Sequence, residues 1–128
     1  MTMQWPRHLD WQHWADRFDR MQERYLVGRS ERFETIVRTI RAVCPQPRRV
    51  LDLGCGTGSL GLAILLAFPC CELVGLDVDE SMLVLAKARL AGFGGRARIL
   101  TADLRADGRL NDIGNGFDAV VSATALHW

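Results

Sequence analysis

Hydrophobic residues in the first third of the chain recur every three or four positions, which is the period of an amphipathic helix. One apolar stripe runs from Trp11 to Tyr25 and a second from Phe33 to Val43, where two prolines follow. Ser30 stands where its side chain could cap the second helix. The pattern therefore predicts two helices before residue 48.

From residue 48 onward, short apolar runs alternate with helical patterns. Strands buried on both faces and joined by helices form parallel sheets. The sequence thus predicts an α/β fold with a doubly wound parallel sheet. It also predicts a loop from Ala106 to Gly116, with room for a short helix. The expected strands are Arg49–Leu53, Glu72–Leu76, Ala97–Thr101 and Phe117–Ser122, and the expected helices are Ser59–Phe68 and Asp79–Ala91.

The composition narrows the class of partner. A length of 128 residues with 48% hydrophobic content provides for one domain core. The formal net charge of +1 gives no electrostatic signal for nucleic acid or an anionic membrane. The amino terminus lacks the apolar stretch of a signal peptide, and the longest apolar run, Leu60–Phe68, is about half of a bilayer span. We therefore expect a cytoplasmic protein that binds a small partner.

The four cysteines, Cys44, Cys55, Cys70 and Cys71, lack the spacing of metal ligands. They form no Cys-x-x-Cys pair, and no histidine stands nearby at a metal-ligand distance in sequence. We expect reduced thiols, mostly packed in the interior, and no metal site.

The candidate chemistry begins in a glycine-rich turn at the end of the first expected strand, which reads Asp52-Leu53-Gly54-Cys55-Gly56-Thr57-Gly58. Glycines at alternate positions allow a sharp turn and a close approach of ligand to backbone. The spacing is Gly-x-Gly-x-Gly rather than the Gly-x-Gly-x-x-Gly of dinucleotide sites, and Asp52 precedes the first glycine by two positions. A tight turn without a ligand is the other interpretation of the same glycines.

Further acidic residues follow the second and third strands. Asp77 lies about 20 residues past the glycine turn, where a carboxylate can accept hydrogen bonds from both hydroxyls of a ribose, although a capping or solvated role is also open. Asp79 is better explained as the N-cap of the next helix. Asp103 follows the third strand, and by itself it would be interpreted as a solvated loop residue.

Together these features resemble the class I, Rossmann-like S-adenosylmethionine-dependent methyltransferases. The glycine turn matches the family's first motif, which wraps the methionine part of the cofactor. The last twelve residues, from Phe117 to Trp128, resemble the fourth motif, which passes into a helix that borders the acceptor pocket. They lack the Asn-Pro-Pro-aromatic or Asp-Pro-Pro-aromatic motif of amino-directed nucleic-acid methyltransferases. The resemblance is therefore to the small-molecule branch, which includes the trans-aconitate methyltransferases.

The resemblance implies a cofactor site built from the ends of the four strands. Asp52 would bind the α-amino group of S-adenosylmethionine, directly or through water, and amides of the glycine turn would receive its carboxylate with help from the helix dipole. Asp77 would bind the ribose, and Val78 and Asp103 the adenine. The whole implied set is Asp52, Leu53, Gly54, Cys55, Gly56, Gly58, Asp77, Val78, Met82, Ala102, Asp103, Leu104, Ser122 and Ala123.

The resemblance also implies the reaction, which is in-line transfer of a methyl group to a small-molecule acceptor with S-adenosylhomocysteine as the product. His127 stands where a general base could act, although a packing or surface role suits a histidine beside a tryptophan better. One alternative is an S-adenosylmethionine-binding module, or a truncated methyltransferase, without turnover. A second alternative, a nucleotide-dependent oxidoreductase, is disfavoured by the glycine spacing.

In the family the sheet has seven strands in the order 3-2-1-4-5-7-6, and this chain is expected to supply only the part 3-2-1-4. Residues 48–128 are expected to form the cofactor-binding core and residues 1–47 a helical cap or lid. Such a sheet leaves one edge of the fourth strand unpaired, and exposed edges recruit other strands. We therefore expect either a homo-oligomer that covers this edge or a marginally stable chain prone to aggregate. Coverage of the edge by the amino-terminal helices is the competing interpretation.

Overall fold

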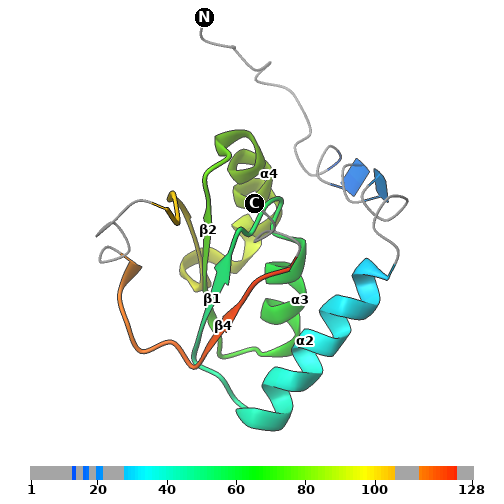
Figure 1. The fold of residues 1–128 in the computed structure, drawn as a ribbon, viewed down its shortest axis with the longest axis vertical. Coiled ribbons are helices and arrows are strands. Elements are labelled where there is room, and N and C mark those ends of the chain that lie inside the picture. Colours follow the sequence, from blue (N-terminus) through cyan, green and yellow to red (C-terminus); the bar gives the residue numbers. More distant parts are fainter. Residues whose placement is uncertain (1–12, 14–15, 18–19, 22–27, 106–112, 124–128) are drawn as a thin grey trace, which may run out of the picture.

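The computed structural model describes residues 13, 16–17, 20–21, 28–105 and 113–123. At its centre lies a parallel four-stranded sheet in the order β3-β2-β1-β4 (Figure 1). The strands are β1 (Arg49–Leu53), β2 (Glu72–Asp77), β3 (Ala97–Thr101) and β4 (Ala119–Val121). The predicted parallel sheet and its strand order are confirmed.

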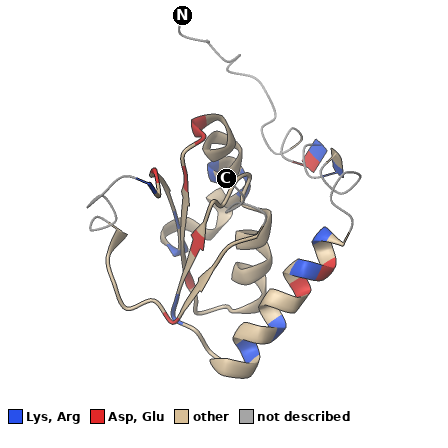
Figure 2. Cartoon of the chain, viewed as in Figure 1, with Lys and Arg blue, Asp and Glu red and all other residues tan. Residues whose placement is uncertain are grey.

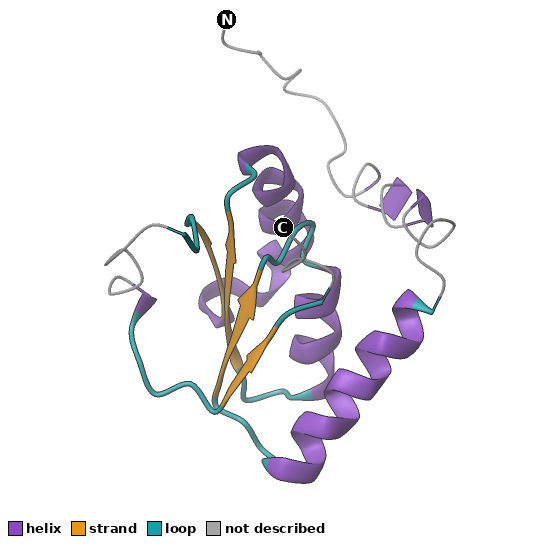
Figure 3. Ribbon diagram, viewed as in Figure 1, coloured by secondary structure: helices purple, strands orange, loops and turns teal. Residues whose placement is uncertain are grey.

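One helix precedes the sheet, and helices connect β1 to β2 and β2 to β3 (Figure 3). The helical elements are α2 (Arg29–Val43), α3 (Ser59–Ala67), α4 (Glu80–Leu90) and the short 3₁₀ helix η1 (Ala91–Arg96). Asp79 caps α4 as expected, because its carboxylate accepts hydrogen bonds from the amides of Ser81 and Met82. At α2 the expected cap is wrong, since the N-cap is Gly28 in a left-handed conformation and no side chain caps the helix.

The core lies mainly between the sheet and one layer of helices. Side chains of α3 and α4, with Ile40 of α2, pack on one face of β1 and β2, as Figure 1 shows for the ribbons. The opposite face carries a smaller cluster, in which Leu51, Val74 and Leu76 meet Ile113. The glycine turn is thus anchored between a buried strand and a buried helix, which fixes its position.

Some expectations fall on residues outside this description. Of the first predicted helix, residues 13, 16, 17, 20 and 21 are described, and they are helical. His127 and most of the expected loop from 106 to 116 lie outside the described residues. Within the described part of the chain, no helix combines the length and apolar character needed to cross a membrane.

Candidate functional site

The predicted site residues gather at one edge of the sheet, where the carboxyl ends of the parallel strands meet. The register aligns Leu53 with Leu76 and Asp77 with Thr101. On the other side of β1, Asp52 aligns with Val121 of β4. Ligands of parallel α/β sheets bind at this edge, near the strand where the order reverses. A common region at this end of the strands is therefore bordered by four segments, which are residues 52–58, 77–82, 102–104 and 122–123.

The three glycines of the turn all have left-handed backbone angles, with φ of 70° at Gly54, 54° at Gly56 and 81° at Gly58. They differ in what surrounds them. A side chain at Gly56 would meet no atom within 4 Å, whereas a Cβ at Gly58 would lie 3.3 Å from Ala86 Cβ and from Leu90 Cδ1. Gly56 thus faces open space that a ligand can enter, and Gly58 allows α4 to pack closely against the turn.

The backbone amides of the turn already donate hydrogen bonds within the protein. Gly54 N and Cys55 N donate to the Leu76 carbonyl at 2.7 and 2.9 Å, and Gly58 N donates to the Cys55 carbonyl at 3.0 Å. Gly56 N donates to Asp77 Oδ2 at 2.8 Å. These four amides hold the shape of the turn, so a ligand carboxylate needs donors beyond them.

Asp52 is a buried carboxyl group near the carboxyl end of β1, with 1% of its surface exposed. Its Oδ2 atom has no hydrogen-bond partner among the described residues. Burial, followed by the negative charge of Asp77, raises the pKa of Asp52 to about 7. A buried carboxylate without a partner is costly, so a ligand with a positive charge or a donor would stabilise this group.

Asp77 joins the end of β2 to the glycine turn. Its Oδ2 accepts the Gly56 amide, and its Oδ1 accepts the Asp79 amide at 3.0 Å. The carboxylate is half-buried. Each carboxylate oxygen can accept more than one hydrogen bond, so both atoms retain capacity for ligand hydroxyls.

The third part of the site combines apolar side chains with a more exposed acid. Val78 is 51% exposed, and Met82 and Leu104 are half-buried at the same edge of the sheet. Asp103 Oδ1 accepts a hydrogen bond from the Arg105 amide at 2.9 Å, and this bond lowers the pKa of Asp103. The Ala102 amide donates to the Asp77 carbonyl at 3.0 Å, which keeps this segment next to β2.

The end of β4 borders a cleft to which α2 contributes residues that the sequence motifs did not indicate. Ser122 Oγ donates to the Leu53 carbonyl at 2.8 Å, so the end of β4 is fixed beside the glycine turn. Ser122 and Ala123 line a cleft of about 640 Å³ together with residues from the start of α2. Those residues are the N-cap Gly28 and Glu31, Arg32, Thr35 and Ile36 of α2. The helical period places Ile36 on the apolar face of the helix, but it gives no indication that the polar residues Glu31, Arg32 and Thr35 border a cleft.

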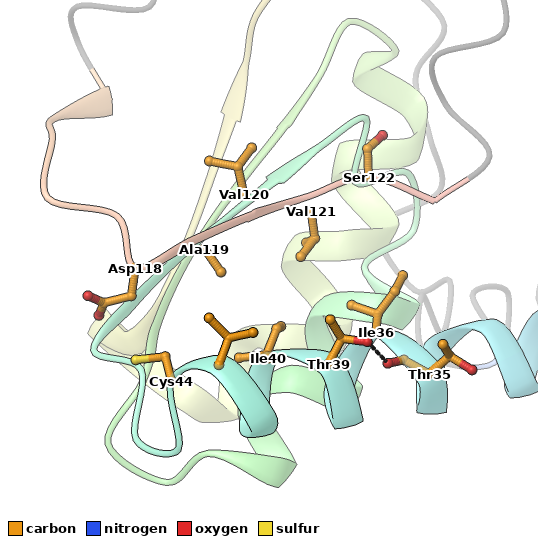
Figure 4. Close-up of a pocket in the computed structure, with 11 residues that line it drawn as sticks. Thr35, Ile36, Thr39, Ile40, Cys44, Asp118, Ala119, Val120, Val121 and Ser122 are labelled. Carbon is orange, nitrogen blue, oxygen red and sulfur yellow. Dashed lines mark hydrogen bonds between the residues drawn. The ribbon is translucent and has the colours of Figure 1, made fainter.

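A second hollow of about 420 Å³ continues along the same helix toward its carboxyl end, between α2 and the outer edge of β4 (Figure 4). Its apolar lining includes Ile36, Ile40 and Val121. The described residues include no group of three His, Cys, Asp or Glu side chains placed to hold a metal ion.

Comparisons with known proteins agree with this geometry. A sequence profile described as a methyltransferase domain matches residues 51–128. The trans-aconitate 2-methyltransferase of Acidovorax ebreus (strain TPSY) is 44% identical over 64 residues, which cover 49% of this chain and 25% of that protein. The chain thus matches a quarter of the length of this curated relative.

Two solved structures extend the similarity to the fold. Streptomyces venezuelae DesVI aligns with a TM-score of 0.64 and 30% identity over 85% of this chain and 42% of that one. CalS10, an amino pentose methyltransferase from Micromonospora echinaspora solved with bound SAM, aligns with a TM-score of 0.57 and 27% identity over 96% of this chain and 44% of that one. Because the family profile covers more than half of the sequence, the chain belongs to the methyltransferase domain family.

Proposed function

We propose that the chain is the S-adenosylmethionine-binding part of a methyltransferase that acts on a small-molecule acceptor. The observation that carries the proposal is the buried Asp52 carboxyl, whose Oδ2 has no partner among the described residues. It lies in the strand that leads into the glycine turn, where Gly56 faces open space. The ligand's α-amino group supplies the positive charge and the donors that this carboxyl needs. Membership of the methyltransferase domain family supports the same cofactor.

The methionine end of the cofactor is assigned to the glycine turn and the start of α3. Asp52 binds the α-amino group, directly or through one water molecule. Because the amides of Gly54, Cys55, Gly56 and Gly58 donate within the protein, the ligand carboxylate is assigned to the amino-terminal turn of α3, where helical backbone amides and the helix dipole favour an anion.

The nucleoside end is assigned to the ends of β2 and β3. Asp77 accepts hydrogen bonds from the two ribose hydroxyls through its remaining lone pairs. Val78 covers one face of the adenine, which accounts for an apolar side chain that is half exposed in the free protein. Asp103 accepts a hydrogen bond from the adenine amino group.

The acceptor is assigned to the cleft between the end of β4 and the start of α2. When bound, S-adenosylmethionine supplies an activated methyl group on its sulfonium. Residues of this chain hold the acceptor in line with that group and exclude water, which is the main source of acceleration when the leaving group is already good. Arg32 and Glu31 line the cleft and provide one charge of each sign for a polar acceptor. His127 stays a predicted general base.

Binding measurements test the cofactor assignment. Calorimetry should show micromolar affinity for S-adenosylhomocysteine and no affinity for NAD. Binding of NAD in place of S-adenosylhomocysteine would overturn the proposal in favour of an oxidoreductase. Turnover of S-adenosylmethionine with a panel of small acids, amines and sugars then separates a methyltransferase from a binding module without turnover. Methylation of RNA with no turnover of small acceptors would contradict the acceptor class.

The remaining assignments concern the cellular location of the protein and the division of the chain into a core and a cap. We propose a cytoplasmic location, supported by four cysteines that form no disulfide, as a reducing compartment favours. We also propose that residues 48–128 form the cofactor-binding core and residues 1–47 a helical cap. The position of Arg32 in the acceptor cleft supports a cap that contributes to the site.

A further inference from the structure

A cluster of polar side chains beside the glycine turn connects separate parts of the chain. The Ser59 hydroxyl oxygen accepts one hydrogen bond from Arg29 Nη2 and another from Arg89 Nη1, both at 2.9 Å. Thr57 Oγ1 lies 3.2 Å from the same oxygen. Thr57 belongs to the glycine turn, Arg29 begins α2, and Arg89 lies near the end of α4. One hydroxyl group therefore links the turn to two helices.

Arg89 also reaches the amino-terminal part of the chain. Its Nη2 lies 3.5 Å from Asp16 Oδ1, and the exposed fractions of the two side chains are 2% for Arg89 and 55% for Asp16. The described amino-terminal residues lie beyond the first turn of α2 (Figure 2). A buried guanidinium group requires polar partners and a compensating charge, because its desolvation is costly. Asp16 supplies a negative charge to a cation that the fold has removed from water.

We propose that Arg89 is a positioning residue for the glycine turn and that Asp16 keeps it in place. The proposal rests on the proposed function, since it assigns the turn to the cofactor. Without Asp16, the guanidinium reorients toward other acceptors and its hydrogen bond to Ser59 weakens. The turn is then held less firmly through Thr57, so its binding-competent shape is less populated and the apparent affinity for the cofactor falls.

The coupling between the Asp16–Arg89 ion pair and cofactor binding acts in both directions. If the Asp16–Arg89 ion pair favours the shape of the turn that binds the cofactor, then the bound cofactor strengthens the ion pair by the same factor. Cofactor binding therefore strengthens the attachment of Asp16 to the core. The segment that carries Asp16 would thus be held more firmly when the cofactor site is occupied.

The test compares Asp16→Asn with Glu34→Gln, which removes another exposed carboxylate, on α2 and outside the cluster around Ser59. Asp16→Asn should raise the Kd for S-adenosylhomocysteine about tenfold, a typical coupling between sites, while Glu34→Gln leaves it unchanged. Asp16→Glu should restore most of the affinity. Adding Asp16→Asn to Arg89→Met should cause no further loss. Salt should weaken binding to the wild type more than to Asp16→Asn.

A second measurement does not depend on affinity. Trypsin cleavage after Arg20 should be slower in the wild type than in Asp16→Asn without ligand, and S-adenosylhomocysteine should slow it further only in the wild type. Equal cleavage rates and equal affinities in wild type and Asp16→Asn would overturn the inference and leave the proposed function intact. Failure of the wild type to bind S-adenosylhomocysteine would instead contradict the proposed function, and the ligand-free cleavage rates would still test the ion pair.

Discussion

Two glycines of the same turn perform different tasks, although they share a left-handed backbone. An added Cβ at Gly56 meets open space, while an added Cβ at Gly58 meets Ala86 and Leu90 of α4. Gly56 therefore leaves room for a ligand, whereas Gly58 leaves room for α4. A substitution at Gly56 should mainly affect ligand binding, and one at Gly58 should mainly affect stability.

We predict that Gly56→Ala reduces the affinity for S-adenosylhomocysteine more than tenfold while lowering the free energy of unfolding by only about 1 kcal/mol, the cost of the backbone angle. Gly58→Ala should lower the free energy of unfolding by about 2 kcal/mol or more, because strain and close contacts add. Calorimetry and thermal unfolding measure the two quantities. Undiminished affinity in Gly56→Ala would remove the turn from the site.

The protonation of Asp52 makes both the stability of the protein and ligand binding depend on pH. Its pKa is raised from 3.8 to about 7 in the folded protein, so its contribution to the stability of the free protein is fully present below pH 3.8 and lost as the pH rises through about 7. A ligand ammonium group favours the ionised carboxylate and lowers this pKa again. Binding near pH 6 should therefore release a proton.

We predict that calorimetry at pH 6, in buffers of different ionisation enthalpy, detects release of up to about one proton when S-adenosylhomocysteine binds the wild type. Asp52→Asn should release none, because the amide does not titrate. The free Asp52→Asn protein should also lose less stability than the wild type between pH 4 and pH 8. Equal proton release by both proteins would show that Asp52 does not face the ligand's amino group.

At the scale of elements, Arg96 holds the end of α3 against the start of β2. Its Nη2 donates to the carbonyls of Leu65 at 3.1 Å and Phe68 at 2.9 Å, and its Nε donates to the Cys71 carbonyl at 3.0 Å. The Leu65 carbonyl lies in the last turn of α3, where no helical amide follows to bind it, and the Phe68 carbonyl at the C-cap also accepts the Cys71 amide at 3.0 Å. The side chain therefore acts as a C-terminal cap that comes from a distant part of the chain.

We predict that Arg96→Met lowers the free energy of unfolding by about 2 to 3 kcal/mol, because part-buried carbonyls lose a charged donor. Denaturant unfolding measures this loss. Arg38→Met, on the exposed side of α2, is the matched control and should change stability by less than about 0.5 kcal/mol. Equal stability of the two variants would show that water replaces the cap without cost.

The sequence predicted the first three strands almost to the residue, because β1 and β2 have buried, mostly apolar centres and β3 follows at the spacing of an alternating strand and helix pattern. Strand β4 is shorter than predicted. Just before it, the Asp118 carboxylate accepts the amides of Arg48 at 2.6 Å and Arg49 at 3.2 Å, while the Asp118 amide donates to the Arg49 carbonyl at 2.8 Å. Side-chain and backbone bonds thus join Asp118 to the start of β1. A contact across some 70 positions leaves no local pattern in the sequence.

The same reason limits what could be predicted of the candidate site. The cap role of Asp79 is local, and the sequence showed it. The bond from Gly56 N to Asp77 Oδ2 and the cluster around Ser59 join segments that are distant in sequence. The sequence placed the site residues at the ends of the strands but did not indicate that the turn amides are already occupied.

At the scale of the whole molecule, β4 is an edge strand of the sheet that the described residues form, and a largely apolar hollow lies between it and α2. Val120 is 59% exposed in the middle of this strand. An apolar edge with unpaired backbone groups invites pairing with another strand. We propose, as the sequence suggested, that the 128-residue chain associates with itself through β4 or tends to aggregate there.

We predict that Val120→Lys shifts the chain toward monomer, because a lysine on an edge strand discourages pairing. Light scattering at several concentrations measures the change. Leu66→Lys, which alters another exposed apolar side chain on α3, is the control and should leave association unchanged. A wild-type monomer whose Val120 and Val121 amides exchange as slowly as those of Val50 would refute the oligomer and favour an intramolecular cover.

The bond between Asp77 and the Gly56 amide has a consequence for ligands smaller than the whole cofactor. The carboxylate assigned to the sugar also holds the loop assigned to the amino acid. Adenosine, by steadying Asp77, would prepare the pocket for methionine, and methionine would do the same for adenosine. Each fragment would therefore bind with a lower Kd when the other is already bound, which is positive cooperativity between the two halves of one ligand.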